Sequence, residues 1–235
     1  MAADTNRFSV IGFTSLSQQV TNELRKSIIE NKLKAGTRIT ESELSENLGV
    51  SRTVIREAIS ILNKDGLLDR ESSHCTRVAK YSSHDVKEIY DMRSCLESSA
   101  LELMEDPAAI ADMLKNKDEE SHGIAKSEPF DGLAFVISDM DFHTCIIKAA
   151  NNSLLLDAWY RIVGPLQVLL HRYIYYVVNN SPDKRASYDH QRIITAFYTG
   201  DKELINKVLV DHCRIMRDIL LKEFILPEEE KEERE

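Results

Sequence analysis

The hydrophobic and polar positions at the start of the chain predict three helices. The first extends from about residue 15 to 31, because apolar residues recur there at every fourth position, as on one face of a helix. These residues are Leu16, Val20, Leu24 and Ile28. Thr40 and Glu43 have the spacing of a capping box and predict a short second helix that ends before the turn residue Gly49. Ser51 is then placed to cap a third helix.

This third helix, from residue 52 to about 65, has two faces of different chemistry. Its apolar face consists of Ile55, Ala58, Ile59 and Leu62, and its polar face of Arg52, Thr53, Arg56, Ser60 and Asn63. Arg and Thr in the first turn suit recognition of the DNA major groove, where the N-terminal end of a recognition helix meets base edges and phosphates. Two short extended segments, 67–71 and 76–79, follow and predict a hairpin. The pattern favours a winged helix-turn-helix over a packing unit whose arginines only solvate a surface.

From Tyr81 onward the periodicity is helical throughout, with no strand alternation. Turn residues separate six predicted helices, at 83–104, 108–126, 130–150, 153–178, 185–198 and 201–224. The expected fold class is therefore mainly α. A winged helix-turn-helix DNA-binding domain at 1–80 precedes an all-α antiparallel bundle at 81–235.

Composition and charge agree with this division. The chain has 235 residues, of which 43% are hydrophobic and 29% charged, so two domains can each bury a core. The net charge is -9, but residues 1–80 carry 12 Lys and Arg against 10 Asp and Glu, and the remainder 18 against 29. No apolar run approaches the roughly 20 residues that cross a bilayer, and the N-terminus lacks the features of a signal peptide. We therefore expect a cytoplasmic protein without a membrane partner.

Polar residues interrupt the apolar faces of three helices in the predicted bundle. Asp139 and His143 lie one turn apart on one face, and His190 and His212 each lie on another. The apolar residues on these faces are Val136, Ile146 and Ala150 for the first pair, Ile193, Ile194 and Phe197 for His190, and Leu204, Val208, Ile215 and Ile219 for His212. A single histidine in such a position is most often an ordinary core residue. Three histidines and an aspartate favour a shared divalent cation, because burying each of them separately costs desolvation energy.

The type of metal follows from these groups. Three neutral imidazoles and one carboxylate suit Zn, Ni, Mn or Co, and they can leave coordination positions open. The sequence does not choose among these metals.

The stretch LKAGTRITESELSENLGVSRTVIREAISILNKDGLL, residues 33–68, resembles the GntR family of transcription regulators. The resemblance implies that Arg52, Thr53 and Arg56 contact operator DNA, and Ser51 of the same motif completes the predicted DNA-binding set. The chain departs from the family pattern at Ala35, where Pro is usual, at Ser42, where some members carry a DNA-contacting Arg, and at the wing tip 72–74, which lacks the Gly of many members.

Residues 81 to about 224 resemble the FCD effector domain of the FadR-like branch of these regulators. The segments DMDFHTCIIKAANN and DHQRIITAFYTGDKELINKVLVDH hold the four metal-ligand positions of its metal-binding members: Asp139, His143, His190 and His212. In this family the metal commonly receives the carboxylate of a small organic acid. Arg93, in the family's Arg-x-x-x-Glu pattern, is a candidate for binding that carboxylate. A purely structural Arg93–Glu97 pair is an equal alternative.

The pattern and the resemblances predict a DNA-binding transcription regulator, expected to be a repressor and not an enzyme. It would bind a double-stranded operator as a homodimer under the control of a small carboxylate metabolite. One alternative is a metal-dependent hydrolase or lyase, because a metal with open positions can activate water. No further acid or base is evidently placed beside the ligands, however, and an enzyme leaves the helix-turn-helix unexplained. A second alternative is a sensor of the metal itself.

Overall fold

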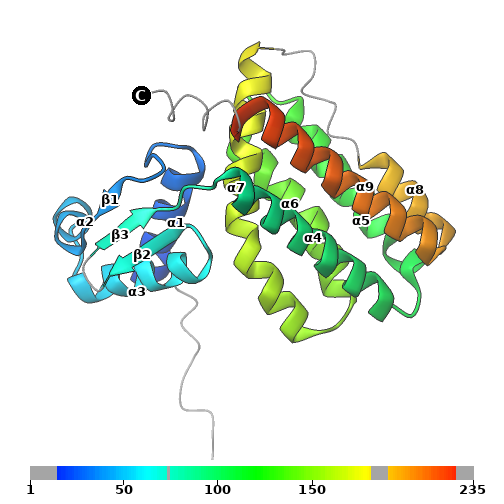
Figure 1. Cartoon of the computed structure of the whole chain (residues 1–235), viewed down its shortest axis with the longest axis horizontal. Helices are drawn as coiled ribbons and strands as arrows, with labels where there is room; N and C mark the ends of the chain where they lie inside the picture. Colours follow the sequence, from blue (N-terminus) through cyan, green and yellow to red (C-terminus); the bar gives the residue numbers. More distant parts are fainter. Residues whose placement is uncertain (1–14, 73–74, 181–189, 226–235) are drawn as a thin grey trace, which may run out of the picture.

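The computed structural model describes residues 15–72, 75–180 and 190–225, which form an N-terminal and a C-terminal part (Figure 1). The N-terminal elements are the helices α1 (Leu16–Ile29), α2 (Glu41–Leu48) and α3 (Arg52–Lys64) and the strands β1 (Arg38–Ile39), β2 (Leu68–Ser72) and β3 (Cys75–Val78). The central strand β3 pairs antiparallel with β1 and β2. The predicted winged helix-turn-helix is therefore confirmed. The sequence pattern did not predict β1, because two residues are too few to show an alternation.

Polar caps begin the helices of this part as the sequence predicts. The hydroxyl groups of Ser15, Thr40 and Ser51 accept hydrogen bonds from the backbone N–H groups of the residues three positions further on, at 3.2, 3.3 and 3.4 Å. Gly49 ends α2 with a φ of 65°, in the left-handed region that glycine adopts without steric cost. The two helices of the motif thus have defined ends, and α3 presents its first turn at the surface.

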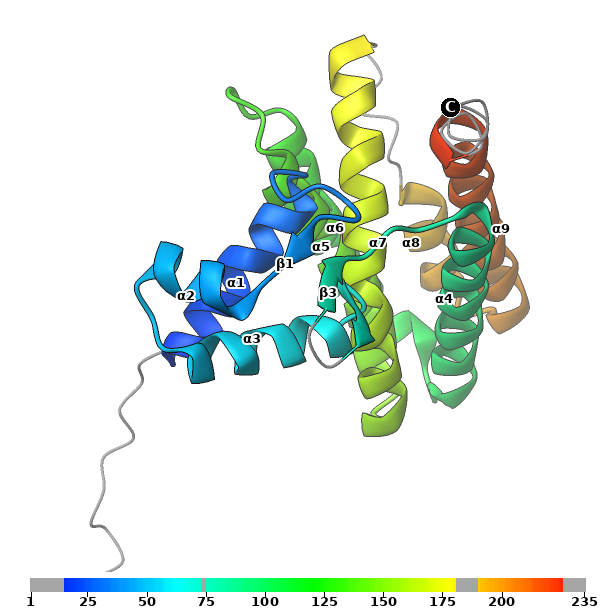
Figure 2. The same ribbon diagram turned by 60° about the vertical axis from the view of Figure 1, so that its left-hand side comes forward.

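Helices make up almost all of the C-terminal part (Figures 1 and 2). They are α4 (Ser83–Leu103), α5 (Ala111–Ala125), α6 (Gly132–Ala149), α7 (Ser153–Asn180), α8 (Gln191–Thr199) and α9 (Lys202–Leu220), with a 3-10 helix η1 (Pro107–Ile110) and a π-helical turn η3 (Leu221–Ile225). Trp159, Phe142 and Phe197 are fully buried in its core, which is separate from the core of the N-terminal part. The predicted helical bundle is confirmed. Among the described residues, no helix combines the length and the apolar character that a membrane crossing requires.

Two details of the bundle differ from the prediction. The helix expected at 185–198 begins only at Gln191, residues 181–189 lie outside the described residues, and His190 directly precedes α8. The predicted inward stripe of α9 is wrong in part, because Leu204 and Ile215 are 40% and 46% exposed. The buried face of α9 instead consists of Ile205, Leu209, Cys213, Met216 and Leu220. Apolar residues occupy two adjacent stripes of α9, and periodicity alone does not tell which one faces the core.

The long helix α7 also contacts the N-terminal part. A Cβ atom at Gly164 would lie 2.6 Å from the carbonyl oxygen of Asp65 and 2.9 Å from Cγ of Leu67, so only glycine allows this close approach. The hydroxyl of Tyr81 donates to the carbonyl oxygen of Gly66 at 2.8 Å. The turn after α3 is therefore packed directly against α7, which lies along α6 in the bundle (Figure 2).

Candidate metal centre and DNA-binding surface

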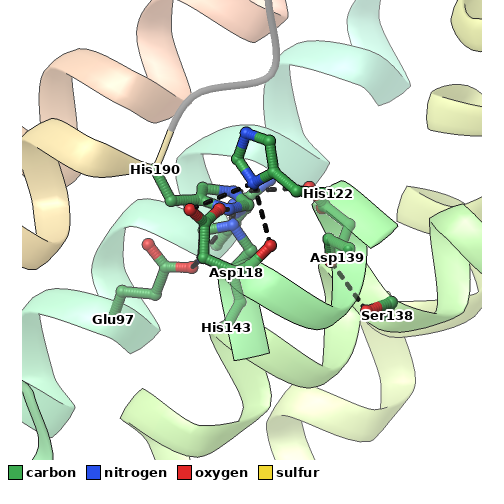
Figure 3. Close-up of polar contacts among 9 residues, drawn as sticks. Glu97, Asp118, His122, Ser138, Asp139, His143 and His190 are labelled. Atoms are coloured by element: carbon green, nitrogen blue, oxygen red, sulfur yellow. Dashed lines mark hydrogen bonds and ion pairs between the residues drawn. The ribbon is translucent and has the colours of Figure 1, made fainter. Parts of the chain in front are cut away.

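The four residues predicted as metal ligands meet inside the bundle. Asp139 and His143 project from α6, His190 precedes α8, and His212 projects from α9. Ligand nitrogens of the three histidines lie within 4.8 Å of one another. Nε2 of His190 lies 3.3 Å from Oδ1 of Asp139, and Figure 3 shows the side chains of Asp139, His143 and His190 converging. Residues up to 73 positions apart in the sequence are thus brought to one point.

Each of these four side chains has a buried polar atom that forms no hydrogen bond of good geometry with the described residues, although carboxylate oxygens of Glu97 and Asp139 lie near two of these atoms, 2.9 Å from Nδ1 of His143 and 3.3 Å from Nε2 of His190. The atoms are Oδ1 of Asp139, Nδ1 of His143, Nε2 of His190 and Nε2 of His212. Leaving one buried polar group unsatisfied costs about 1–3 kcal/mol. One cation that accepts lone pairs from all four groups would remove this cost, so both the types of group and their unsatisfied atoms fit a divalent metal.

The sequence prediction missed Asp118, a buried residue of α5 that contacts this cluster. Its Oδ1 accepts a hydrogen bond from Nδ1 of His190 at 3.1 Å, and its Oδ2 lies 3.3 Å from Nδ1 of His122 (Figure 3). With the proton on Nδ1, His190 directs Nε2 towards the other predicted ligands. The available signal was that Leu114, Asp118 and Ser121 share one buried face of α5. This pattern is hard to recognise in the sequence, because the residues around Asp118 are also charged.

Arg93 and Glu97 lie at the other side of the cluster, and both are buried. Nε of Arg93 donates to Oε1 of Glu97 at 3.2 Å, so the i,i+4 pair named as an alternative is present. Nη2 of Arg93 also lies 2.6 Å from Nε2 of His143, and Oε1 of Glu97 lies 2.9 Å from Nδ1 of that ring. The Arg93–Glu97 pair therefore contacts a predicted metal ligand. It can stabilise the bundle and take part in the candidate metal centre at the same time.

The surroundings give the three histidines different protonation. Burial lowers the pKa of His143 and of His212 well below the usual value, and the Arg93 guanidinium lowers both further. Burial also favours neutral His190, but the carboxylates of Asp118 and Asp139 outweigh it and raise the pKa of His190 to about 9. Two of the rings are therefore neutral at pH 7, as a metal ligand has to be, and the third holds a proton that a metal has to displace.

The predicted DNA-binding residues lie at the start of α3. Arg52, Thr53 and Arg56 are exposed, whereas the hydroxyl of Ser51 is occupied as the cap of the helix. Arg56 donates from Nε and Nη2 to the two carboxylate oxygens of Glu41, at 3.0 and 2.8 Å. Within the wing tip, residues 73 and 74 lie outside the described residues. The structure thus brings the predicted recognition residues to one surface and adds a partner for Arg56.

Two family profiles match the chain, and they divide it as the fold does. Residues 16–78 match the family described as "Bacterial regulatory proteins, gntR family", and residues 88–214 match the FCD domain. The chain belongs to the GntR family. It is a DNA-binding transcription regulator with an FCD domain, and the recognition helix and the candidate metal centre fall inside the two matched regions.

The regulator is also similar to individual proteins along most of its length. It is 28% identical to the uncharacterized HTH-type transcriptional regulator YdhC of Bacillus subtilis, over 86% of this chain and 91% of that one. It is 28% identical to a probable D-xylose utilization operon transcriptional repressor of Paenarthrobacter nicotinovorans, over 85% and 86%. The solved structure of E. coli McbR/YncC has a TM-score of 0.69 at 22% identity and covers 90% of this chain and 100% of its own. This structural likeness supports the fold.

Proposed function

We propose that this GntR regulator is a homodimeric repressor whose operator binding is controlled by a small organic acid held at a divalent-metal centre in its FCD domain. The observation that carries the proposal is the convergence of Asp139 with His143, His190 and His212, whose ligand nitrogens lie within 4.8 Å of one another. In this proposal residues 1–80 bind DNA, residues 81–235 bind metal and effector, and the protein acts in the cytoplasm, where the operator is.

The roles of the buried residues follow from their contacts. Asp139 and the three histidines would hold the metal, which when bound would act as a Lewis acid that attracts a carboxylate. Asp118 keeps the His190 ring in one orientation through the hydrogen bond to Nδ1. Arg93 is the cation nearest to His143 and is therefore the side chain placed to bind an effector carboxylate.

The relatives suggest which acids to test first. The names of matched proteins include gluconate operon transcriptional repressors of two Bacillus species and the D-xylose repressor already mentioned. A hydroxy acid derived from a sugar offers both a carboxylate and neighbouring hydroxyl groups as metal ligands. We therefore propose this class as effector.

A DNA-shift assay on an operator-containing fragment tests the function. The protein is compared after treatment with EDTA, after reloading with metal, and with metal plus sugar acids. We expect DNA binding with and without metal and release from DNA only with metal plus acid. Control of DNA binding by metal alone would instead establish the metal-sensor alternative. Turnover of an acid by the metal-loaded protein, without any effect on DNA binding, would establish the enzyme alternative.

The outer surfaces of α4 and α9 support the homodimer. These helices lie antiparallel, with Nζ of Lys202 donating to the carbonyl oxygen of Glu102 near one end and Arg217 pairing with Asp91 near the other. Exposed apolar side chains flank both contacts: Met92, Leu103, Leu204 and Ile215. A second copy that covers this face would explain why α9 carries two apolar stripes. Ile215→Glu should then shift sedimentation towards monomer, whereas Leu154→Glu, at an exposed leucine of α7, should leave the dimer intact.

DNA recognition by Arg52 and Arg56 is tested by alanine substitution of each. A recognition helix contributes few base contacts by itself, and pairing two half-sites in a dimer compensates for this. Loss of a bidentate contact to a base should reduce discrimination between operator and other DNA on the order of tenfold or more. Unchanged binding in both variants would contradict the assignment of α3 as recognition helix.

A further inference from the structure

A concavity of about 670 Å³ lies beside the recognition helix, between α3 and the sheet. Three arginines from different elements line it: Arg38 of β1, Arg56 of α3 and Arg70 of β2. The other side chains on its wall include Ser60, Asn63 and Thr76, which can donate or accept hydrogen bonds. The hollow is therefore polar and mainly positive.

The register of the sheet explains how Arg70 comes to line this hollow. Leu68 pairs with Val78, and both are buried. Two residues further along, Arg70 pairs with Thr76, and side chains two positions apart on a strand point to the same face. The face that forms the core at Leu68 and Val78 thus continues outward as an arginine and a threonine. At this point the apolar core ends and the concavity begins.

The described residues do not balance the charges in the concavity. Among them, Glu41 is the only carboxylate on its wall, and it is paired with Arg56. The side chains of Arg38 and Arg70 are exposed and form no hydrogen bond or ion pair with any described residue. Arg70 acts on the Glu41 carboxylate only through space, so the three guanidinium groups of the concavity share one carboxylate among the described residues. An anion is the ligand that this arrangement suits.

The position beside α3 identifies the anion. A helix that lies in the major groove is flanked by the sugar-phosphate strands that border that groove, and phosphate contacts fix the register of the protein on DNA. We propose that the concavity holds the sugar-phosphate backbone of one operator strand, with Arg38 and Arg70 as its phosphate ligands. This site is separate from the base-reading residues at the start of α3 and does not depend on the metal centre.

The salt dependence of DNA binding tests this proposal with the full chain. The probe is a mixed-sequence DNA duplex, and affinity is measured by fluorescence anisotropy over a range of salt concentrations. Each phosphate contact contributes about 0.9 to the slope of log affinity against log salt. Arg38→Ala and Arg70→Ala should therefore each lower the slope by about one per bound protomer, and the double variant by about two. Lys26→Ala removes an exposed charge of α1 outside the concavity and should leave the slope unchanged.

Further variants separate a phosphate contact from other roles. Arg70→Lys keeps the charge and should retain most of the slope, because phosphate accepts a contact from either side chain. An unchanged slope in the double variant would overturn the proposal. A loss confined to particular base sequences would also overturn it, since it would indicate base recognition. Thermal stabilisation by inorganic phosphate that is lost in the double variant, with an unchanged slope for DNA, would overturn it in favour of a small-anion site. Melting curves of each variant confirm that the fold is retained.

Discussion

The regulator contains two Arg–Glu pairs with similar contacts in opposite surroundings. Arg56 of α3 donates to Glu41, and their side chains are 68% and 37% exposed. Arg93 donates to Glu97 within α4, and their side chains are 3% and 0% exposed. Water screens and solvates the first pair, so its contribution to stability is small. The second pair is out of contact with water, and each charge there depends on its partner.

This difference suits the two pairs to different tasks. Arg56 can exchange its carboxylate partner for DNA at little cost, which a recognition residue on a surface requires. Arg93 and Glu97 cannot separate without leaving a buried charge unpaired, so they hold α4 against the ring of His143. The predictions below test this contrast between exposed and buried charge, from the largest expected effect to the smallest.

The largest effect should follow from breaking the buried pair. Glu97→Ala removes the carboxylate that contacts both the Arg93 guanidinium and the His143 ring, and removal of one partner of a buried pair costs about 3–5 kcal/mol. We expect urea unfolding to show a loss of this size. The matched control is Glu41→Ala, which should change stability far less. Equal losses in the two variants would contradict the contrast.

A double variant of the buried pair sharpens the result. Arg93→Met with Glu97→Leu replaces both charges by apolar groups, and such replacements are often neutral or stabilising. This variant should recover much of the stability lost in Glu97→Ala while losing the response to an organic acid. Stability without effector response would separate the structural role of the pair from its role in binding.

The next effect concerns the metal. His190→Ala removes one of the four proposed ligands, and we expect protein purified without a tag or chelator to lose stoichiometric metal by elemental analysis. A ligand at 100 times its Kd stabilises the folded state by about 2.7 kcal/mol, so EDTA should lower the Tm of the unaltered protein but not that of the variant. His171→Ala, at a half-buried histidine of α7, is the control. A Tm unaffected by EDTA, with no metal before treatment, would identify these histidines as ordinary core residues.

Asp118→Asn should weaken metal binding without removing a ligand. The neutral amide accepts a weaker hydrogen bond from Nδ1 of His190 than the carboxylate does. Loss of such supporting carboxylates typically lowers metal affinity about 10- to 100-fold. Competition with a coloured chelator measures the Kd. Glu119→Gln, an exposed neighbour on α5, should leave it unchanged. If both variants bind metal as tightly as the unaltered protein, Asp118 has only a structural role.

The same division between exposed and buried groups explains what the sequence could predict. The polar face of α3 could be predicted from the spacing of Arg52, Thr53 and Arg56, because polar and apolar residues alternate with the period of a helix. The candidate ligands could also be predicted, since a polar residue such as Asp139 or His143 stands out among apolar neighbours.

The missed features depend on contacts between distant elements. Asp118 looks like one more acid on a charged helix until the fold brings it within 3.1 Å of His190, which is 72 residues away. The predicted inward face of α9 is wrong in part, at Leu204 and Ile215, because both candidate stripes are apolar. The concavity at Arg38 and Arg70 arises from the pairing of three strands, and the shortest of these strands leaves no periodic signal.

The proton held by His190 gives a smaller but specific effect. Its pKa of about 9 means that the metal-free protein carries this proton at pH 7, whereas a metal ligand has to be neutral. Metal binding at pH 7 should therefore release about one proton from this group. Calorimetry in two buffers of different ionisation enthalpy measures this release. Absence of proton release would show that His190 is already neutral.

The sign of the stability effect follows from the same pKa. A pKa raised from 6.5 to about 9 on folding stabilises the metal-free protein below pH 6.5, and this stabilisation is lost as the pH rises to 9. The lowered pKa values of His143 and His212 act in the other direction and destabilise the fold below pH 6.5. The metal-free protein should thus lose stability on either side of this pH, while metal binding strengthens as the pH rises.

The smallest change in stability should come from the exposed pair, where the consequence appears in DNA binding instead. Glu41→Gln removes the carboxylate that partners Arg56 and leaves the concavity with three unopposed arginines. The Tm should hardly change, because the pair is solvated. Affinity for a mixed-sequence duplex should rise severalfold at low salt, because one repulsive charge near the phosphates is gone. Discrimination between operator and other DNA should be retained, since Arg56 gives up its contact with Glu41 when it binds DNA. Weaker binding to every sequence would instead show that Glu41 holds Arg56 in the position from which it contacts the DNA backbone.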